Sequence, residues 1–247
     1  TTKSFAFSGL SDGMHEVKIS AYDKAGNKAE STTVIFVDNT APQPFEILSD
    51  TAGWSANPTP VLSFETEDDQ SGIAGYECRI DGGVWQEVVS PYTLPVLSEG
   101  HHIAEIKAID EAGNITVASI ALLIDITAPE SFPVIILPSN CTSNTQPDIT
   151  FKTSDNISGI KGYEVAINDG LFIPATSPFK AGPLEDGVYL VRVKAIDHAG
   201  NETVSETKLE IDTVPPAVPD GFRVLPGDRE VKVVWKEHQK DVVEYRI

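Results

Sequence analysis

Acidic side chains that could bind a cation recur at a fixed interval along this chain of 247 residues. The motif Asp-x-Ala-Gly-Asn occurs three times, each copy starting 87 residues after the last, at Asp23–Asn27, Asp110–Asn114 and Asp197–Asn201. A second segment, Asp-x-x-x-Pro, keeps the same interval, at Asp38–Pro42, Asp125–Pro129 and Asp212–Pro216. Carboxylate and amide oxygens are the hard ligands that Ca²⁺ prefers. The chemistry that these residues offer is therefore cation binding, once per repeat.

The overall charge agrees with a cation as partner. Acidic residues number 37 and basic residues 18, for a formal net charge of −19. Nucleic acid and anionic membranes select for Lys and Arg, so the sequence predicts neither as a partner. The longest apolar run, Val117–Ile124, is interrupted by Ser119 and is far shorter than a spanning helix. We expect no membrane span in this segment.

No catalytic constellation is found, so the sequence predicts no catalytic residue. No serine lies in a nucleophile-elbow pattern, and no pair of the five histidines has zinc-ligand spacing. His15 and His102 are equivalent in the repeat, and Tyr189 replaces them in the third copy. A half-buried packing role fits this exchange better than a role as a base.

The two cysteines also favour packing over chemistry. Cys78 shares one strand face with Tyr76 and Ile80, which indicates a small buried hydrophobe, with a disulfide or metal ligand as the alternatives. Cys141 aligns with Trp54 of the previous repeat, again a packing position.

The elements that must position the acids are β-strands. In the stretch 102–108, His102, Ala104, Ile106 and Ala108 alternate with polar residues such as Glu105, and the pattern recurs at 189–195. This period of two, with one apolar and one charged face, is typical of an antiparallel sheet wetted on one side. About seven such strands in roughly ninety residues, separated by turn residues, predict an immunoglobulin-like sandwich. The predicted fold is all-β, with tandem immunoglobulin-like sandwiches in a linear array.

The repeat interval predicts the domain boundaries. Residues 43–129 and 130–216 each make one immunoglobulin-like domain, and residues 1–42 align with the C-terminal part of another. Residues 217–247 break the pattern and are too few to bury a sandwich core. We expect the chain to be a piece of a longer protein that runs through two incomplete domains. Completion of these half-domains by strands of a neighbouring chain is the alternative.

Sandwich topology predicts that the acids meet. The B–C and F–G loops share one end of the sandwich, where the chain also enters the first strand. At the first such end we expect metal ligands from the set Asp38, Asp68 or Asp69, Asp110 and Asn114, with Asn39 as a further candidate. At the second we expect Asp125, Asp155, Asp197 and Asn201. Carboxylates held a few ångströms apart repel strongly unless a cation neutralises them.

Turn formation is the competing interpretation of the same residues. Asp-x-Ala-Gly-Asn suits a hairpin turn, with Asp accepting backbone hydrogens and Gly in the left-handed conformation. Asp-Asn-Thr-Ala-Pro can simply end a strand, because proline denies it another ladder donor. The turn role and the Ca²⁺ role are compatible, and both stay open at this point.

The string Gly-x-His/Tyr-x-Val/Ala-x-Val/Ile-x-Ala-x-Asp-x-Ala-Gly-Asn, followed by Asp-x-Thr/Val-Ala/Pro-Pro, resembles bacterial immunoglobulin-like repeats of surface adhesins, stalks and secreted enzymes. The Cys…Trp…Cys triplet of antibody domains is missing. Residues 218–235 resemble the opening of a fibronectin type III domain, with Trp235 as its core tryptophan and Tyr245 on the next strand. The resemblance implies an extracellular or cell-surface location and supports Ca²⁺ between domains.

The leading functional hypothesis is a non-catalytic stalk or spacer, because linkers of about four residues with proline leave little freedom between domains. Its partners would be neighbouring domains of the same chain, with other copies of itself or a surface glycan as further candidates. A carbohydrate- or host-surface-binding module is the first alternative, and Trp54 is its candidate ligand-binding residue. Spacer repeats of a secreted hydrolase are the second alternative.

Overall fold

A computed structural model describes residues 3–218, 220–236, 242 and 244. These residues form twenty β-strands and no helix, so the predicted all-β class is confirmed. Among them no helix exists that has the length and hydropathy needed to cross a membrane.

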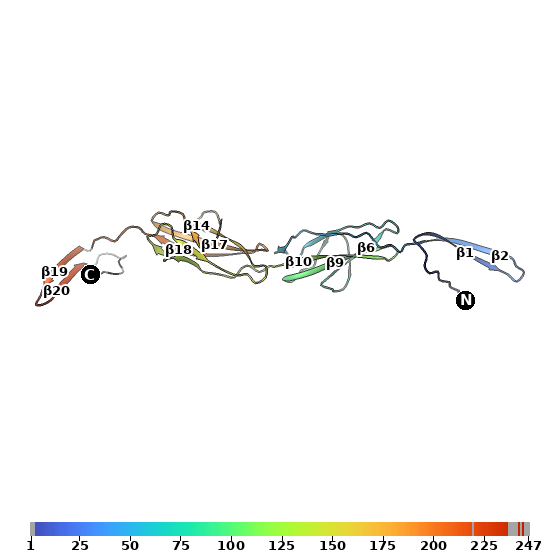
Figure 1. Cartoon of the computed structure of the whole chain (residues 1–247), viewed down its shortest axis with the longest axis horizontal. Helices are drawn as coiled ribbons and strands as arrows, with labels where there is room; N and C mark the ends of the chain where they lie inside the picture. Colours follow the sequence, from blue (N-terminus) through green and yellow to red (C-terminus); the bar gives the residue numbers. More distant parts are fainter. Residues whose placement is uncertain (1–2, 219, 237–241, 243, 245–247) are drawn as a thin grey trace. The chain divides into compact units, whose positions relative to one another are not determined.

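Residues 47–124 form a sandwich of a five-stranded and a three-stranded sheet (Figure 1). The five-stranded sheet has the order β4-β10-β9-β6-β7, with bounds Trp54–Ser55, Ile115–Ile124, Gly100–Asp110, Ile73–Ile80 and Gln86–Val88. The three-stranded sheet has the order β3-β5-β8, with bounds Ile47–Ser49, Val61–Phe64 and Tyr92–Thr93. The short edge strand β4 pairs parallel to β10, while β9 pairs antiparallel to both β10 and β6.

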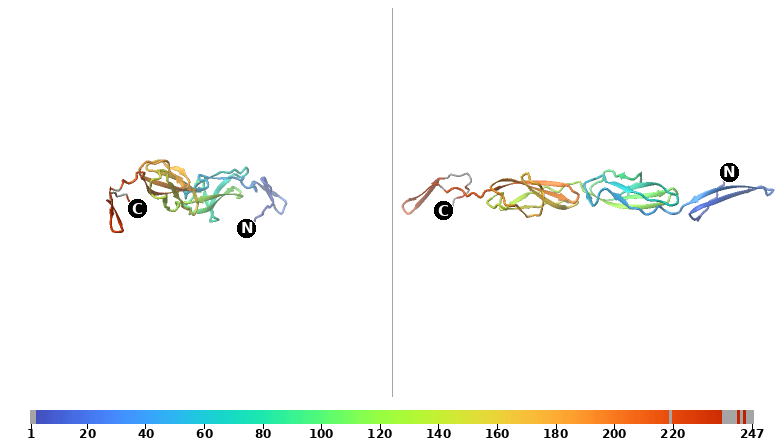
Figure 2. Two further views of the ribbon diagram at one scale, coloured as in Figure 1. Left: turned by 60° about the vertical axis from the view of Figure 1, so that its left-hand side comes forward. Right: turned by 90° about the horizontal axis from the view of Figure 1, so that it is seen from above.

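Residues 134–211 repeat this topology strand for strand. The five-stranded sheet has the order β12-β18-β17-β14-β15, with bounds Cys141–Thr142, Glu202–Ile211, Gly187–Asp197, Ile160–Ile167 and Ile173–Ala175. The three-stranded sheet has the order β11-β13-β16, with bounds Val134–Leu137, Asp148–Phe151 and Phe179–Lys180. Figure 2 shows the strands of each sandwich from two further sides.

Two further hairpins stand outside the sandwiches. One pairs β1 (Gly13–Tyr22) with β2 (Lys28–Val37), and the other pairs β19 (Asp220–Pro226) with β20 (Val231–Lys236). Trp235 lies half-buried on β20. Tyr245, predicted on the following strand, lies outside the described residues.

Each sandwich has its own apolar core, built from the alternating positions. Leu62, Phe64, Cys78, Ile106 and Ile124 are buried in the first, and the equivalent Ile149, Phe151, Val165, Val193 and Ile211 are buried in the second. Burial of the side chains on one face of each strand is the main term that stabilises both sandwiches.

The two cysteines differ in burial. Cys78 is buried as predicted, whereas the prediction of a packing role for Cys141 is wrong, because its side chain is exposed. Both Cys141 and Trp54 lie on two-residue edge strands. The Trp54 ring is large enough to reach the His101 ring, with their centroids 5.2 Å apart, whereas cysteine has a much smaller side chain.

Contacts between residues divide the chain into two compact units. The first contains Thr1–Pro129 with two later segments, Ser154–Lys161 and Ile196–Glu202, and the second contains the rest. The first of these segments holds most of the β13–β14 loop and the first two residues of β14, and the second holds the turn between β17 and β18 with the adjoining strand residues. The four-domain division expected from the repeat interval stays a prediction.

Candidate metal centres

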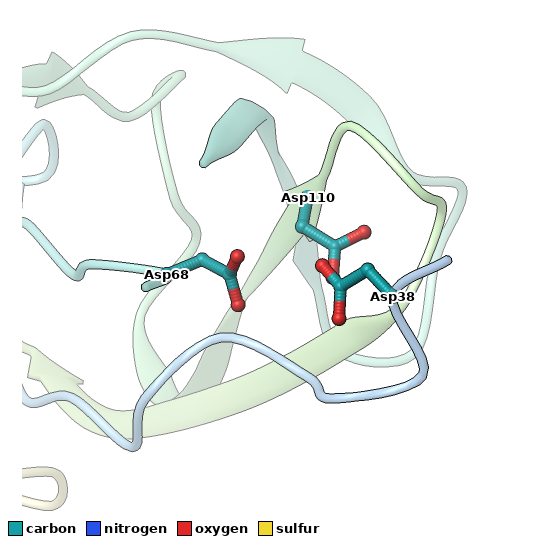
Figure 3. A group of neighbouring side chains, drawn as sticks. All are labelled: Asp38, Asp68 and Asp110. Atoms are coloured by element: carbon teal, nitrogen blue, oxygen red, sulfur yellow. The ribbon is translucent and has the colours of Figure 1, made fainter. Parts of the chain in front are cut away.

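Three carboxylates converge at the start of the first sandwich. Asp38 directly follows β2, Asp68 lies in the loop between β5 and β6, and Asp110 is the last residue of β9. Each offers one oxygen, and these oxygens all lie within 4.8 Å of one another. Figure 3 shows the three carboxylates turned toward a common point.

Backbone hydrogen bonds hold these carboxylates in place. The Oδ1 atom of Asp68 accepts from the backbone N–H groups of Gln70, Ser71 and Gly72 at 2.8–3.1 Å. Asp38 Oδ1 accepts from the N–H of Thr40 at 2.9 Å, and its Oδ2 accepts from the Ser71 hydroxyl at 2.5 Å. A carboxylate fixed in this way loses little side-chain freedom when its remaining oxygen binds an ion.

A second cluster repeats the first after 87 residues. Its members Asp125, Asp155 and Asp197 again place one oxygen each within 4.8 Å of the others. Asp155 Oδ1 accepts from three consecutive N–H groups, those of Ile157, Ser158 and Gly159. Both clusters lie within the first compact unit.

The charges in these clusters are poorly compensated by side chains. Asp110, Asp125 and Asp197 are at most 1% exposed, and they are the buried charged residues of the described chain. Within the described residues, no Lys or Arg forms an ion pair with any of the six carboxylates. Buried charges are normally paired or coordinate a metal. Backbone dipoles offset part of this charge, and a cation would offset the rest.

The Asp68 carboxyl is tuned toward the charged form. Its burial raises the pKa, but the backbone hydrogen bonds from Ser71, Gln70 and Gly72 together lower it, and the net effect is a pKa below the usual value. Hydrogen bonds to the ionised form have this effect because they stabilise the charge. The carboxylate is thus available as a ligand down to acidic pH.

The other predicted ligands take different positions. Asn114 donates its side-chain N–H groups to the carbonyls of Asp38 and Thr40, at 3.2 Å each, and to Asp110 Oδ2 at 2.8 Å. Asn201 makes the equivalent bonds to Asp125, Thr127 and Asp197. Asp69 is exposed and lies outside the three-carboxylate group. Asn39 donates to Asp12.

Turn chemistry is present in all three copies of the motif. The first Asp of each copy accepts from the backbone N–H of the closing Asn, at 2.8–2.9 Å. The Gly takes a positive φ each time, +89°, +93° and +92° at Gly26, Gly113 and Gly200. In the first copy the pKa of Asp23 is lowered, chiefly by the hydrogen bond from the Asn27 side chain. The turn therefore forms with or without a neighbouring carboxylate cluster.

A repeated acid that the sequence reasoning missed anchors each Asp-x-x-x-Pro segment. Asp12 accepts from Asn39 N and the Thr40 hydroxyl, at 2.7 Å each, and these bonds lower its pKa, the Thr40 bond most. Glu99 binds Ile126 N and the Thr127 hydroxyl, and Asp186 binds Thr213. The available signal was an acid immediately before the repeated Gly13, Gly100 and Gly187.

The candidate ligand-binding aromatic, Trp54, is half-buried on β4 and packs edge-to-face against His101. Trp85 lies with its ring under two cations, 4.4 Å from the Arg79 guanidinium carbon and 4.2 Å from Lys107 Nζ. Phe172 holds the equivalent place beside Arg192 and Lys194. Each of these rings thus already packs against a neighbouring side chain of the same sandwich.

Comparisons with known proteins give the following likenesses. No family model matches the chain. Chitinase A1 of Niallia circulans is 30% identical over 193 residues, a match that covers 73% of this chain and 27% of that protein. The chain therefore spans about a quarter of the length of the curated relative that it matches.

Two solved structures are among those similar to this chain. The fibronectin(III)-like modules of Clostridium thermocellum CbhA are 17% identical, with a TM-score of 0.44 and coverage of 67% of this chain and 93% of that one. A tetra-tandem repeat from the extending region of a large adhesion protein is 22% identical, with a TM-score of 0.32 and coverage of 83% and 58%. The chain is similar to fibronectin III-like modules and to tandem adhesin repeats, the two kinds of repeat that its sequence resembles.

Proposed function

We propose that this chain is a non-catalytic spacer segment of a larger extracellular or cell-surface protein, stiffened by Ca²⁺ bound at its two carboxylate clusters. The observation that carries the proposal is the convergence of Asp38, Asp68 and Asp110, and again of Asp125, Asp155 and Asp197. Each cluster joins an Asp-x-x-x-Pro segment to a loop and a strand end further along the chain. A cation held there would fix the linker to the domain that follows it.

The donor set favours Ca²⁺ over other common metals. All the converging ligands are carboxylate oxygens, and neither histidine nor cysteine contributes, which disfavours Zn²⁺. Ca²⁺ accepts irregular geometry and six to eight oxygens, so backbone carbonyls and water can complete its shell. We assign Asn114 and Asn201 to positioning the linker, because their amide groups donate to its carbonyls.

Calorimetric titration of the chain with Ca²⁺ tests the proposal. We expect two sites with dissociation constants on the order of 10⁻⁷ to 10⁻³ M, the span from sensor sites to extracellular modules. Asp110→Asn should abolish one site and Asp197→Asn the other. Asparagine keeps an oxygen that can accept the turn hydrogen bond, so both variants should fold, which circular dichroism checks.

Asp23→Asn is the matched control, because Asp23 opens the same motif on the β1–β2 hairpin and belongs to neither cluster. Its titration should keep both sites. A wild-type chain that takes up no Ca²⁺ at millimolar concentration would overturn the metal assignment. Equal loss of Ca²⁺ in the Asp23 and Asp110 variants would show that binding is not confined to the clusters.

The spacer role is also compatible with the similarity to Chitinase A1. Chitinase A1 is a much longer protein than this chain, and the match leaves most of it uncovered. Spacer repeats serve a secreted hydrolase and an adhesin in the same physical way, by setting distance and stiffness. We therefore propose the spacer role without assigning an enzymatic activity to these residues.

A further inference from the structure

His102, at the start of β9, lies in a hydrogen-bond chain that requires a charged ring. Its Nδ1 atom is 2.7 Å from Asp81 Oδ2, and its Nε2 atom is 3.0 Å from the backbone carbonyl oxygen of Ser98. A carboxylate and a carbonyl only accept hydrogen bonds, so each ring nitrogen must carry a proton to satisfy both. The geometry therefore describes an imidazolium.

The Nε2 contacts distinguish this group from a catalytic triad. The Ser98 hydroxyl lies 3.3 Å from Nε2, which gives the Ser-His-Asp order of a hydrolase triad. In a working triad the neutral Nε2 removes the serine proton. Here Nε2 is closer to the Ser98 carbonyl oxygen, at 3.0 Å, than to the Ser98 hydroxyl, so the carbonyl is its nearer partner.

The second sandwich contains an uncharged version of the same corner. Tyr189 occupies the place of His102, and its hydroxyl donates to the carbonyl of Glu185 at 2.8 Å, in the manner of a tyrosine corner. Asn168 occupies the place of Asp81 with the same backbone conformation, φ of 53° against 52°. Asn168 Oδ1 accepts from Leu190 N as Asp81 Oδ1 accepts from Ile103 N. The titratable pair of the first sandwich, His102 and Asp81, is therefore replaced as a whole by an uncharged pair in the second.

This corner adjoins an anchor of the linker. Ser98, whose carbonyl oxygen accepts the hydrogen bond from His102 Nε2, directly precedes Glu99 in the chain. Glu99 Oε1 accepts from the backbone N–H of Ile126 at 3.1 Å and from the Thr127 hydroxyl at 2.5 Å. The imidazolium thus fixes the backbone from which the anchoring carboxylate extends, and all of these residues lie in the first compact unit.

We propose that protonation of His102 controls how firmly Glu99 holds the Asp125–Pro129 linker, which makes this linker responsive to pH near neutrality. The Asp212–Pro216 linker, anchored by Asp186 beside the Tyr189 corner, is the version without this response. At the positions of His102 and Asp81, the second site has the uncharged pair Tyr189 and Asn168.

The groups that face His102 set the direction of the response. Asp81, in the turn after β6, is the charged group that contacts His102. Ser98, before β9, and Leu122, opposite His102 on β10, are uncharged. His101 packs against Trp54, and the Glu99 carboxylate is bonded to the linker. The Asp81 hydrogen bond raises the pKa of His102 above its usual value, against a smaller opposing effect of burial.

The raised pKa of His102 in the folded state determines how its stabilising effect changes with pH. The stabilisation is fully present below the unfolded histidine pKa, near 6.5, and is lost as pH rises through the folded value. Asp81 itself has a lowered pKa, chiefly through the His102 bond, so its contribution is lost only at acidic pH as pH falls through that lowered value. The corner is therefore firm at mildly acidic pH and loosens above neutrality.

Nuclear magnetic resonance of the whole chain, without Ca²⁺ and with excess chelator, tests this. The His102 ring should titrate above about 6.5, and Asp81→Asn should lower that midpoint. The hydrogen-exchange protection factor of the Ile126 amide should fall between about pH 5.5 and pH 8.5, by about tenfold for each unit of upward pKa shift that is measured.

The double variant His102→Tyr/Asp81→Asn copies the neutral corner of the second sandwich and keeps both structural hydrogen bonds. Its Ile126 protection factor should be independent of pH, like that of the Thr213 amide in the wild-type chain. A His102 midpoint at or below about 6.5 overturns the proposal. An Ile126 protection factor that stays constant with pH also overturns it, even with a raised midpoint, because the link to the linker would be missing.

Discussion

At the scale of single residues, Asn114 separates a turn that only closes a hairpin from a turn that also holds a linker. Among the described residues, the side chain of Asn27 in the first copy bonds to Asp23 alone. Asn114 makes the same bond to Asp110 and reaches two linker carbonyls as well. The additional partners come from a segment 74–76 residues away, so the same motif acquires a long-range role.

We predict that Asn114→Ala lowers the free energy of unfolding of the first sandwich by about 1–3 kcal/mol, because Asp110 loses a donor in a buried site. Urea unfolding followed by the fluorescence of Trp54 and Trp85, which lie in this sandwich, measures the change. Asn27→Ala should leave this transition where it is. Equal shifts in the two variants would mean that the linker contacts contribute nothing.

At the scale of elements, the β9–β10 hairpin depends on a backbone conformation that only glycine adopts readily. Gly113 has a φ of +93°, and a Cβ added there would meet no atom within 4 Å. The cost of a side chain is therefore conformational strain and not a steric clash. This distinction makes the position a clean test of the turn.

We predict that Gly113→Ala destabilises the first sandwich by about 1–2 kcal/mol, the cost of a left-handed conformation for an L-residue. Gly75→Ala on β6 is the control, since Gly75 also has open space but no left-handed φ. That variant should be neutral or slightly stabilising, because alanine loses less entropy on folding. Thermal unfolding of both variants compares them, and an equal loss would contradict the strain argument.

The sheets and cores could be predicted because apolar and polar residues alternate along each strand, and the apolar positions mark the buried face. Leu62, Phe64 and Ile106 are buried as their period-two pattern indicates. Convergence of Asp38, Asp68 and Asp110 followed from sandwich topology alone. The choice between Asp68 and Asp69 could not be made, because it depends on three backbone N–H groups that turn toward Asp68 only in the folded loop.

Other features left too little signal in the sequence. Glu99 and Asp186 serve as linker anchors through contacts 27 residues away, and their motif is no more than an acid before a glycine. The exposure of Cys141 could not be inferred from its alignment with Trp54, because the large Trp54 ring packs against His101 and a cysteine side chain is much smaller. The role of His102 required the position of Asp81, whose partner lies 21 residues further along.

At the scale of the whole molecule, charge decides how the chain responds to cations. Its formal net charge is −19, and the two carboxylate clusters concentrate part of that charge on the linkers at Asp38 and Asp125. An ion that binds only the folded clusters stabilises them by mass action, so the effect grows with its concentration. Ca²⁺ should therefore control the linkers more strongly than it controls the sandwich cores.

We predict that chelation loosens the first two linkers and leaves the third unchanged. Without Ca²⁺, three carboxylates repel at Asp38 and at Asp125, so limited proteolysis should cut faster at residues 39–42 and 126–129. Among the described residues no carboxylate cluster forms at Asp212, so cleavage at residues 213–216 is the internal control. Small-angle scattering with Ca²⁺ and with EDTA should differ for the wild-type chain and agree for the Asp110→Asn/Asp197→Asn variant. Identical wild-type profiles and cleavage rates in the two conditions would show that bound Ca²⁺, if present, does not stiffen the chain.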